Sequence, residues 1–481
     1  MANSPDTLTI AKKLRENGKI KESLAILGHY HKNHPKELYA NWIYAQVAYQ
    51  SHKLSLASGL YEQAVRLSPD DNVLRLDYAK FLVNTGNFRK ADVQLTKYTA
   101  INISNPEPWY YLAKINYWKG KNKESLALLD NLLRNVPGYT PAQLLRDQIL
   151  RELSPWLSMD ASYSSDDQPM NMLNPAIRGG LYRSNLVGLD FRIVAPVSFR
   201  SGKNFYAAGF SIGNRFHLSK PNMNFYLNLG VYDLNTLHTI GWTGDFKIEK
   251  NLLRKVTVWA EILRKPYLST ESSLGTPVFE NHLTLAASLN NPDHWNGRLS
   301  FEGSTFSTDN NSIKAFCGWI FVPAIKTRRF DFHFGYGYNY STAKESRFTS
   351  EKPLSEILSA WDPAVPISGI YNPYFTPKDQ QVHSLLAIIQ IRAAERLKFT
   401  VNINGGFYAT TQYPYLFLEK DASGSIFIQR ASEKKSFNPV SVNAGMDWQV
   451  SGSIDLHAQA DCSKTIYYTT QTFSISLRKR F

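Results

Sequence analysis

The chain ends in Thr472-Phe473-Ser474-Ile475-Ser476-Leu477-Arg478-Lys479-Arg480-Phe481. Successive side chains of an extended strand point to opposite faces, so Phe473, Ile475 and Leu477 share one face. The other face carries hydroxyl and guanidinium groups. Such a strand is typical of an outer-membrane β-barrel, where one side meets lipid and the other a wet lumen. Taken alone, it would also suit the edge of a soluble sheet.

The same alternation recurs throughout the second part of the chain, for example in Phe330–Tyr340. Sixteen such segments follow one another, the first at 156–165 and the last at 468–481. Connections after even-numbered segments are short, whereas several after odd-numbered segments are long, above all 342–379 and 411–436. Short periplasmic turns that alternate with long extracellular loops are typical of outer-membrane barrels. We therefore predict an antiparallel barrel of about sixteen strands, closed by pairing of the first segment with the last.

The first part of the chain repeats itself with a different period. Two series of small residues each recur every 34 residues: Ala11, Ala45, Ala79 and Ala113, and Ser23, Ala57, Ala91 and Ser125. This is the period of tetratricopeptide repeats, in which small residues lie where paired helices cross. The sequence predicts an α-solenoid of four helix pairs and a capping helix over 1–153, followed by the barrel over 154–481.

The composition agrees with a barrel and excludes several other classes. Aromatic residues make up 13% of the chain, as suits aromatic girdles. Mean hydropathy is −0.33, and no apolar run is long enough for a membrane-spanning helix. The net charge of +14 is spread along the chain, so we expect no nucleic-acid partner.

Chemical motifs are missing from the sequence. We find no Gly-rich phosphate loop, no metal-ligand spacing and no nucleophile elbow, and two cysteines are too few for a disulfide framework. Asp331 and His333 lie two apart on one predicted strand, but no nucleophile accompanies them. We expect neither a cofactor nor enzyme activity.

Met1-Ala2-Asn3-Ser4-Pro5 has no cationic start and no apolar run, so it is not a signal peptide. A barrel of the bacterial outer membrane must be exported, and we expect that a leader has been removed. The parity of the loop lengths places the repeat domain in the periplasm.

The lumen-facing side chains suggest a translocation path. A flat aromatic face can cover the CH-rich face of a pyranose, while acids, amides and arginines exchange hydrogen bonds with its hydroxyls. The alternative is that the aromatics fill the lumen or form girdles and that the charges pair across it. The residues expected to line the path are Tyr226, Tyr232, Trp259, Glu261, Asp331, Tyr408, Asp455, Arg478 and Arg480.

Two further surfaces are candidates for function. The 342–379 connection is rich in Pro and aromatics, and a long, stiff loop of this kind is expected to fold over the pore as an extracellular lid, or to be a rigid decoration. Its candidate lid residues are Trp361, Tyr371, Tyr374 and Phe375. On the concave face of the repeats we expect a partner-binding groove that displays Tyr44, Arg75, Tyr78 and Lys114.

A tetratricopeptide array joined to a C-terminal barrel resembles the bacterial exopolysaccharide export porins of the cellulose and poly-N-acetylglucosamine types. The resemblance implies a sixteen-stranded barrel that passes a polysaccharide from periplasm to cell surface during biofilm formation. It also implies repeats that guide the polymer or recruit periplasmic or inner-membrane synthase components. The segment 371–377, Tyr-Asn-Pro-Tyr-Phe-Thr-Pro, resembles a Tyr/Phe–Ser–Pro element of the cellulose porin. The four repeats are fewer than members of that family usually carry.

The chain also resembles the surface lipoprotein assembly modifiers, which join a short repeat domain to a smaller barrel. That resemblance implies translocation of surface lipoproteins instead. A third interpretation is an interaction scaffold whose barrel only anchors the repeats in outer-membrane lipid.

Overall fold

The computed structural model describes residues 4–168, 170–184, 187–200, 203–218, 223–253, 255–291, 294–362 and 365–481. The chain forms two compact units, Met1–Glu152 and Leu153–Phe481. Among the described helices, none is both long enough and apolar enough to cross a membrane.

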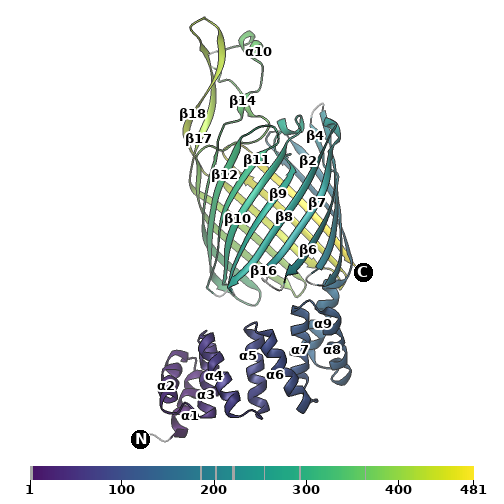
Figure 1. Ribbon diagram of the computed structural model, residues 1–481. Helices are drawn as coiled ribbons and strands as arrows, with labels where there is room; N and C mark the ends of the chain where they lie inside the picture. Colours follow the sequence, from purple (N-terminus) through teal and green to yellow (C-terminus); the bar gives the residue numbers. More distant parts are fainter. Residues whose placement is uncertain are drawn as a thin grey trace. The chain divides into compact units, whose positions relative to one another are not determined.

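The first unit is a series of antiparallel helix pairs, as the repeat predicts (Figure 1). Within each pair the first helix packs on the second, and each second helix also contacts the next pair. The helices are α1 (Ser4–Glu16), α2 (Ile20–Asn33), α3 (Leu38–Gln50), α4 (Leu54–Leu67), α5 (Asn72–Asn84), α6 (Phe88–Ile101), α7 (Pro106–Trp118), α8 (Asn122–Asn135) and α9 (Thr140–Leu153).

The repeated small residues explain this packing. Ala79 and Ala113 are completely buried where two helices cross. The hydroxyl of Ser125 donates a hydrogen bond of 2.8 Å to the carbonyl oxygen of Ala113, and Ser23 does the same to Ala11 at 2.7 Å. A larger side chain at either kind of position would push the paired helices apart.

The second unit is a closed antiparallel barrel of 16 strands in the described part of the chain, which confirms the predicted fold. Its wall consists of β1 (Trp156–Asp166), β2 (Asn171–Ser184), β3 (Val187–Val194), β6 (Ala208–Leu218), β7 (Met223–Leu234), β8 (Thr239–Leu253), β9 (Val256–Pro266), β10 (Phe279–Asn291), β11 (Trp295–Phe306), β12 (Ser312–Lys326), β13 (Phe330–Ala343), β16 (Gln380–Ala394), β17 (Leu397–Lys420), β19 (Val440–Gln449), β20 (Ile454–Lys464) and β21 (Thr469–Arg480).

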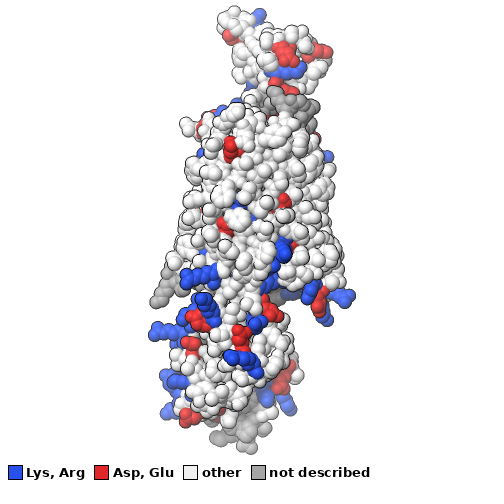
Figure 2. Space-filling model, turned by 90° about the vertical axis from the view of Figure 1, so that its right-hand side faces the viewer, with Lys and Arg blue, Asp and Glu red and all other residues white. Residues whose placement is uncertain are grey.

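Pairing of β1 with β21 closes the barrel. The register runs from Trp156 opposite Arg480 to Asp166 opposite Thr470. The outer phase of the strands exposes large apolar side chains such as Leu229, and Figure 2 shows one barrel face on which charged side chains are sparse. With no edge strand left, every backbone group of the wall can find a partner inside hydrocarbon.

Shorter elements extend the barrel at the end away from Trp156, which we call the far end; the end where β1 begins is the near end. The sequence predicts a loop at 411–436, but β17 continues through it and pairs with β18 (Ile426–Phe437) as a hairpin beyond the wall (Figure 1). The other far-end elements are β4 (Val197–Arg200), β5 (Lys203–Tyr206), β14 (Phe348–Ser350), α10 (Leu354–Ser359) and β15 (Gly369–Tyr371).

Candidate functional site

The strand register defines rows of side chains that face the lumen. In one row Arg478 lies opposite Ser158, Ser158 opposite Arg178, and Arg178 opposite Arg192. The row continues from Arg192 to Ser211 on β6. Because paired residues on neighbouring strands share a face, these five side chains form one inward band across the wall.

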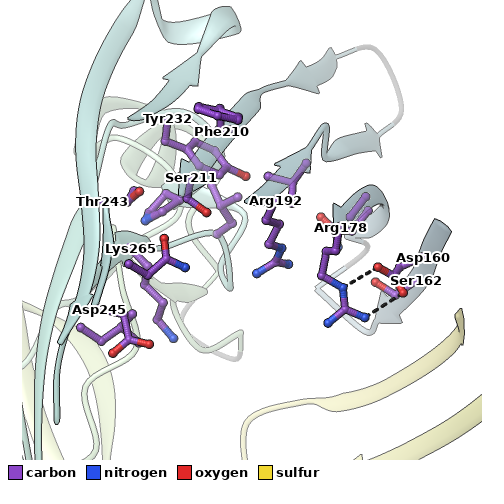
Figure 3. Close-up of a pocket in the computed structure, with 18 of the residues that line it drawn as sticks. Asp160, Ser162, Arg178, Arg192, Phe210, Ser211, Tyr232, Thr243, Asp245 and Lys265 are labelled. Carbon is purple, nitrogen blue, oxygen red and sulfur yellow. Dashed lines mark hydrogen bonds and ion pairs between the residues drawn. The ribbon is translucent and has the colours of Figure 1, made fainter. Parts of the chain in front are cut away.

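A cavity of about 590 Å³ lies on the lumen side of the wall, and Arg178, Arg192 and Ser211 of this band are among its lining residues. Figure 3 shows Arg178 and Arg192 directed into it, with Asp245 and Lys265 on other strands of its lining. Small residues form part of its lining, among them Gly209 and Ser211 on β6. The lining combines apolar side chains with polar ones and carries both signs of charge.

Some inward charges neutralise each other. The guanidinium of Arg178 donates two hydrogen bonds, of 2.6 and 2.8 Å, to the carboxylate of Asp160. Arg480 pairs with Asp455. Asp331 is only 6% exposed and pairs with Arg392 at 2.8 Å. The contacts of these pairs are those of lumen salt bridges.

The inward aromatics of the near half are covered by cations. Lys247 lies over the rings of Tyr226 and Trp259, at 5.6 and 5.5 Å from their centroids. Arg298 lies 4.8 Å from the Trp259 ring. Glu261 is opposite Lys247 in the register. Such cation–aromatic contacts hold a flat face at the lumen wall and place a hydrogen-bond donor beside it.

Tyr232 occupies a tighter place. It lies opposite Gly209 and Gly241 in the register, and a Cβ built on Gly209 would meet its ring at 2.5 Å. The ring therefore rests on glycine backbone at the far half of the cavity. Glycine is required there because the aromatic side chain fills the position that a neighbour's Cβ would occupy.

The prediction that Tyr408 faces the lumen is wrong. The pairing of β16 with β17 shifts by one residue between His383 and Ser384, so that Tyr408 lies opposite His383. His383 in turn lies opposite Tyr338, on the outer phase of β13. The bulge adds Phe407 to one strand, and the alternation read from sequence changes phase there. Tyr408 therefore belongs to an outward aromatic group.

At the far end the segment 371–377 packs deeply. Tyr374 is completely buried, and its ring stacks on Phe306 with centroids 3.5 Å apart. Its hydroxyl donates to the Asp309 carboxylate at 2.7 Å, which also pairs with Arg347 at 2.9 Å. The main chain of the segment joins in, since Phe375 donates its N–H to the hydroxyl of Tyr267 at 3.2 Å.

The same segment also contacts the connection between β20 and β21. The ring of Phe375 lies 4.5 Å from that of Tyr467, and Tyr371 lies 5.4 Å from it. Tyr267 lies in the connection between β9 and β10. Around the barrel wall, the same number of strands separates this connection from the β20–β21 connection in either direction, so the two lie on opposite sides of the mouth. The segment therefore crosses the far mouth from side to side.

Burial raises the pKa of the phenols at this mouth above the ordinary tyrosine value. Burial, followed by the nearby Asp166, raises the pKa of Tyr468 to about 12. Burial likewise raises the pKa of Tyr371 and Tyr467. At ordinary pH the cluster therefore behaves as apolar rings with hydroxyl tips.

Trp361 takes no part in this packing, because its side chain is 51% exposed. Sequence reasoning missed the partners of the segment, Tyr267, Tyr467 and Tyr468, and the inward arginine Arg178. Arg178 was detectable, since it falls on the polar phase of its strand. The tyrosines lie in connections, where no periodicity places a side chain.

The predicted repeat groove is partly wrong. Arg75 is 7% exposed, and its guanidinium is held by the carbonyl oxygen of Pro69 and by Gln94. Tyr78 is 3% exposed and stacks on Tyr61 inside the helical core. Helix packing consumes both side chains, which a spacing argument cannot foresee.

Tyr44 and Lys114 lie nearer the surface of the repeats. Tyr44 packs partly buried against the helical core, and Lys114 lies over Trp118 at 4.9 Å. A pocket of about 580 Å³ lies beside Tyr78 and is lined by Glu62, Arg66, Arg89, Lys90 and Gln94, among others.

No protein-family model matches the chain, and no curated protein matches it either. Among solved structures, a bacterial polysaccharide outer membrane secretin is 10% identical, with 69% of this chain and 99% of that chain covered and a TM-score of 0.49.

Two tetratricopeptide structures match the helical part. YrrB, described as having an unusual peptide-binding site, is 16% identical over 30% of this chain and 75% of its own, with a TM-score of 0.28. MamA from Desulfovibrio magneticus RS-1 is 10% identical over 30% and 80%, with a TM-score of 0.28.

Proposed function

We propose that the barrel exports a polysaccharide across the bacterial outer membrane. The polymer enters the barrel at the near end and leaves it at the far end. The observation that carries the proposal is the lining of the lumen. Hydroxyl, amide and glycine positions alternate there with cation-covered aromatic faces, as at Tyr226 and Trp259. A pyranose chain presents CH faces and hydroxyls in a regular series, so many weak, equivalent contacts of this kind let it slide without being trapped.

The segment 371–377 is the natural gate for such a path. It lies across the far mouth and is held on one side by Tyr267 and Phe306 and on the other by Tyr467. A loop that lies over a pore blocks the passage of solutes and polymers until it is displaced. In this proposal an arriving polymer, or a partner, releases the aromatic contacts and the mouth opens toward the cell surface.

The repeats supply the partner-binding function. Their pocket of about 580 Å³ presents Glu62, Arg66, Arg89 and Lys90, which suits a charged segment of another protein. We propose that the repeat domain lies in the periplasm and holds a component of the polymer synthase there, or guides the polymer toward the near end of the barrel.

A deletion strain tests the proposal. Removal of the gene should abolish surface carbohydrate and leave surface lipoproteins at their normal level, and a copy that carries the native chain should restore the carbohydrate. Loss of a surface lipoprotein with normal carbohydrate would overturn the proposal in favour of lipoprotein translocation. Normal levels of both would favour a barrel that only anchors the repeats.

A further inference from the structure

We propose that the exported polymer is acidic, and that its carboxylates are bound by a wall of arginines on β21, β1, β2, β3 and β6. This inference rests on the proposed function and names the substrate class. The residues of the wall that carry it are Arg192, Arg215 and Arg478, with Arg178 and Arg480 beside them.

The register places these cations close together. Arg478, Arg178 and Arg192 belong to the inward row described above, and the hydroxyl residues Ser158 and Ser211 take the places between and beside them. Small side chains between long cations leave room for a ligand above the row. The cavity of about 590 Å³ lies there and is lined by both Arg178 and Arg192.

Three of the guanidiniums lack a carboxylate partner. Within the described residues Arg192, Arg215 and Arg478 make no hydrogen bond and no ion pair, and the Nε atoms of Arg215 and Arg478 are buried without an acceptor. A buried polar group without a partner is costly. Such a group in a lumen wall is a candidate for satisfaction by a ligand.

Aromatic rings hold two of these guanidiniums in place. Arg215 lies over the ring of Tyr182 at 4.1 Å, and Arg478 over the ring of Trp156 at 4.3 Å. A stacked guanidinium keeps its in-plane N–H groups free, because the ring contacts only its flat face. The planar fork is thereby presented edge-on, in the orientation that binds a carboxylate with two parallel hydrogen bonds.

The wall as a whole is positive. Counted with Asp455 of β20, which pairs with Arg480, its inward charged side chains are five arginines and four aspartates: Arg178, Arg192, Arg215, Arg478, Arg480, Asp160, Asp166, Asp190 and Asp455. Asp160 is taken by Arg178, and Asp190 accepts a hydrogen bond from Tyr182 at 2.7 Å. Among the residues that the structure describes, the positive charge that no carboxylate contacts therefore lies on Arg192, Arg215 and Arg478.

The wall across β8–β11 differs. Its cations already face carboxylates: Lys247 pairs with Glu249 at 3.2 Å, and Arg298 lies 3.9 Å from Glu302. Asp245 and Glu261 make no ion pair in the described part of the chain. Asp245 lies two residues before Lys247 on β8, and Glu261 lies opposite Lys247 on β9. A polymer carboxylate is therefore attracted more strongly to the arginine wall, while hydroxyls of the sugar suit the other side.

The experiment measures binding of defined oligosaccharides to the full-length protein in detergent by isothermal titration calorimetry. The probes are oligogalacturonates, neutral cello-oligosaccharides and cationic chitosan oligomers of equal length. We expect the oligogalacturonates to bind tightest and their affinity to fall as salt is added, because salt screens guanidinium–carboxylate attraction.

Two matched double variants locate the binding. Arg192→Gln with Arg478→Gln removes two unpartnered cations and should weaken oligogalacturonate binding by about tenfold or more. Lys352→Gln with Lys435→Gln removes the same charge from the far-end elements, where both lysines already pair with glutamates, and should leave binding within about threefold of native. Heat-modifiable migration on a gel checks that both variants retain a folded barrel.

Equal affinity for acidic and neutral probes, preference for the cationic probe, no binding of any probe, or equal loss in both variants would each overturn the acidic class. None of these results would contradict the export proposal itself. That proposal is tested by the levels of surface carbohydrate and surface lipoprotein in the deletion strain. The two failures are therefore distinguishable.

Discussion

At the scale of single residues, the repeat domain depends on small side chains at helix crossings. Ala79 is completely buried between helices. We predict that Ala79→Leu destabilises the helical unit by about 1–3 kcal/mol, because a well-packed site must move to accept the extra carbons. The measurement is thermal loss of helical circular dichroism. Ala100→Leu, on the exposed side of α6, is the control, and equal melting of the two variants would contradict the packing argument.

Residue-level prediction from sequence succeeded where a side chain's place follows from periodicity alone. Ala45 and Ala79 of the 34-residue series are completely buried, and Ser125 of the second series donates a hydrogen bond to the carbonyl oxygen of Ala113. Tyr408 could not be placed, because a bulge is set by how two strands pair and leaves no mark in either sequence. The prediction for Arg75 failed for a related reason: its guanidinium is held by the carbonyl oxygen of Pro69, in the connection before its helix, and by the amide of Gln94 on α6.

At the scale of elements, the far mouth is closed by contacts between connections rather than between strands. Tyr374 is the centre of one side, since it combines the stack on Phe306 with hydrogen bonds to Asp309. The sequence indicates a stiff, aromatic loop at 342–379 but not its partners. Those partners, Tyr267 and Tyr467, are distant in sequence and lie in other connections.

We predict that Tyr374→Ala opens the mouth. Truncation of a buried aromatic side chain costs about 3–5 kcal/mol, which is enough to shift a loop from a closed to a mobile state. Conductance in planar bilayers should rise well above that of the native chain. Trp361→Ala removes an aromatic from the same connection but from an exposed position, so its conductance should stay native. Unchanged conductance of the Tyr374 variant would show that this segment does not gate the pore.

At the scale of the whole molecule, the sequence predicts the architecture well because it contains two clear periods: a 34-residue repeat in the first part and an alternation of apolar and polar residues in the second. Side chains that alternate between lipid and lumen must keep their phase along every strand, so the strand number follows from counting segments. The arginine wall is harder to foresee. Arg192 and Arg478 are far apart in sequence and come to lie in one row only when β21 pairs with β1, β1 with β2 and β2 with β3. The closing register, which no single strand contains, assembles the candidate site.

Closure itself can be tested. Removal of 469–481 deletes β21 and leaves β1 and β20 as two unpaired edges. Unpaired backbone groups cost several kcal/mol each in hydrocarbon, so we expect the truncated chain to lose heat-modifiable migration and to fail to assemble in the outer membrane. Removal of 415–431 deletes the outer part of the β17–β18 hairpin, beyond the wall that β17 forms with β19. This control should migrate like the native barrel. If the chain without β21 still assembled and shifted on heating, the pairing of β1 with β21 would not be what closes the barrel.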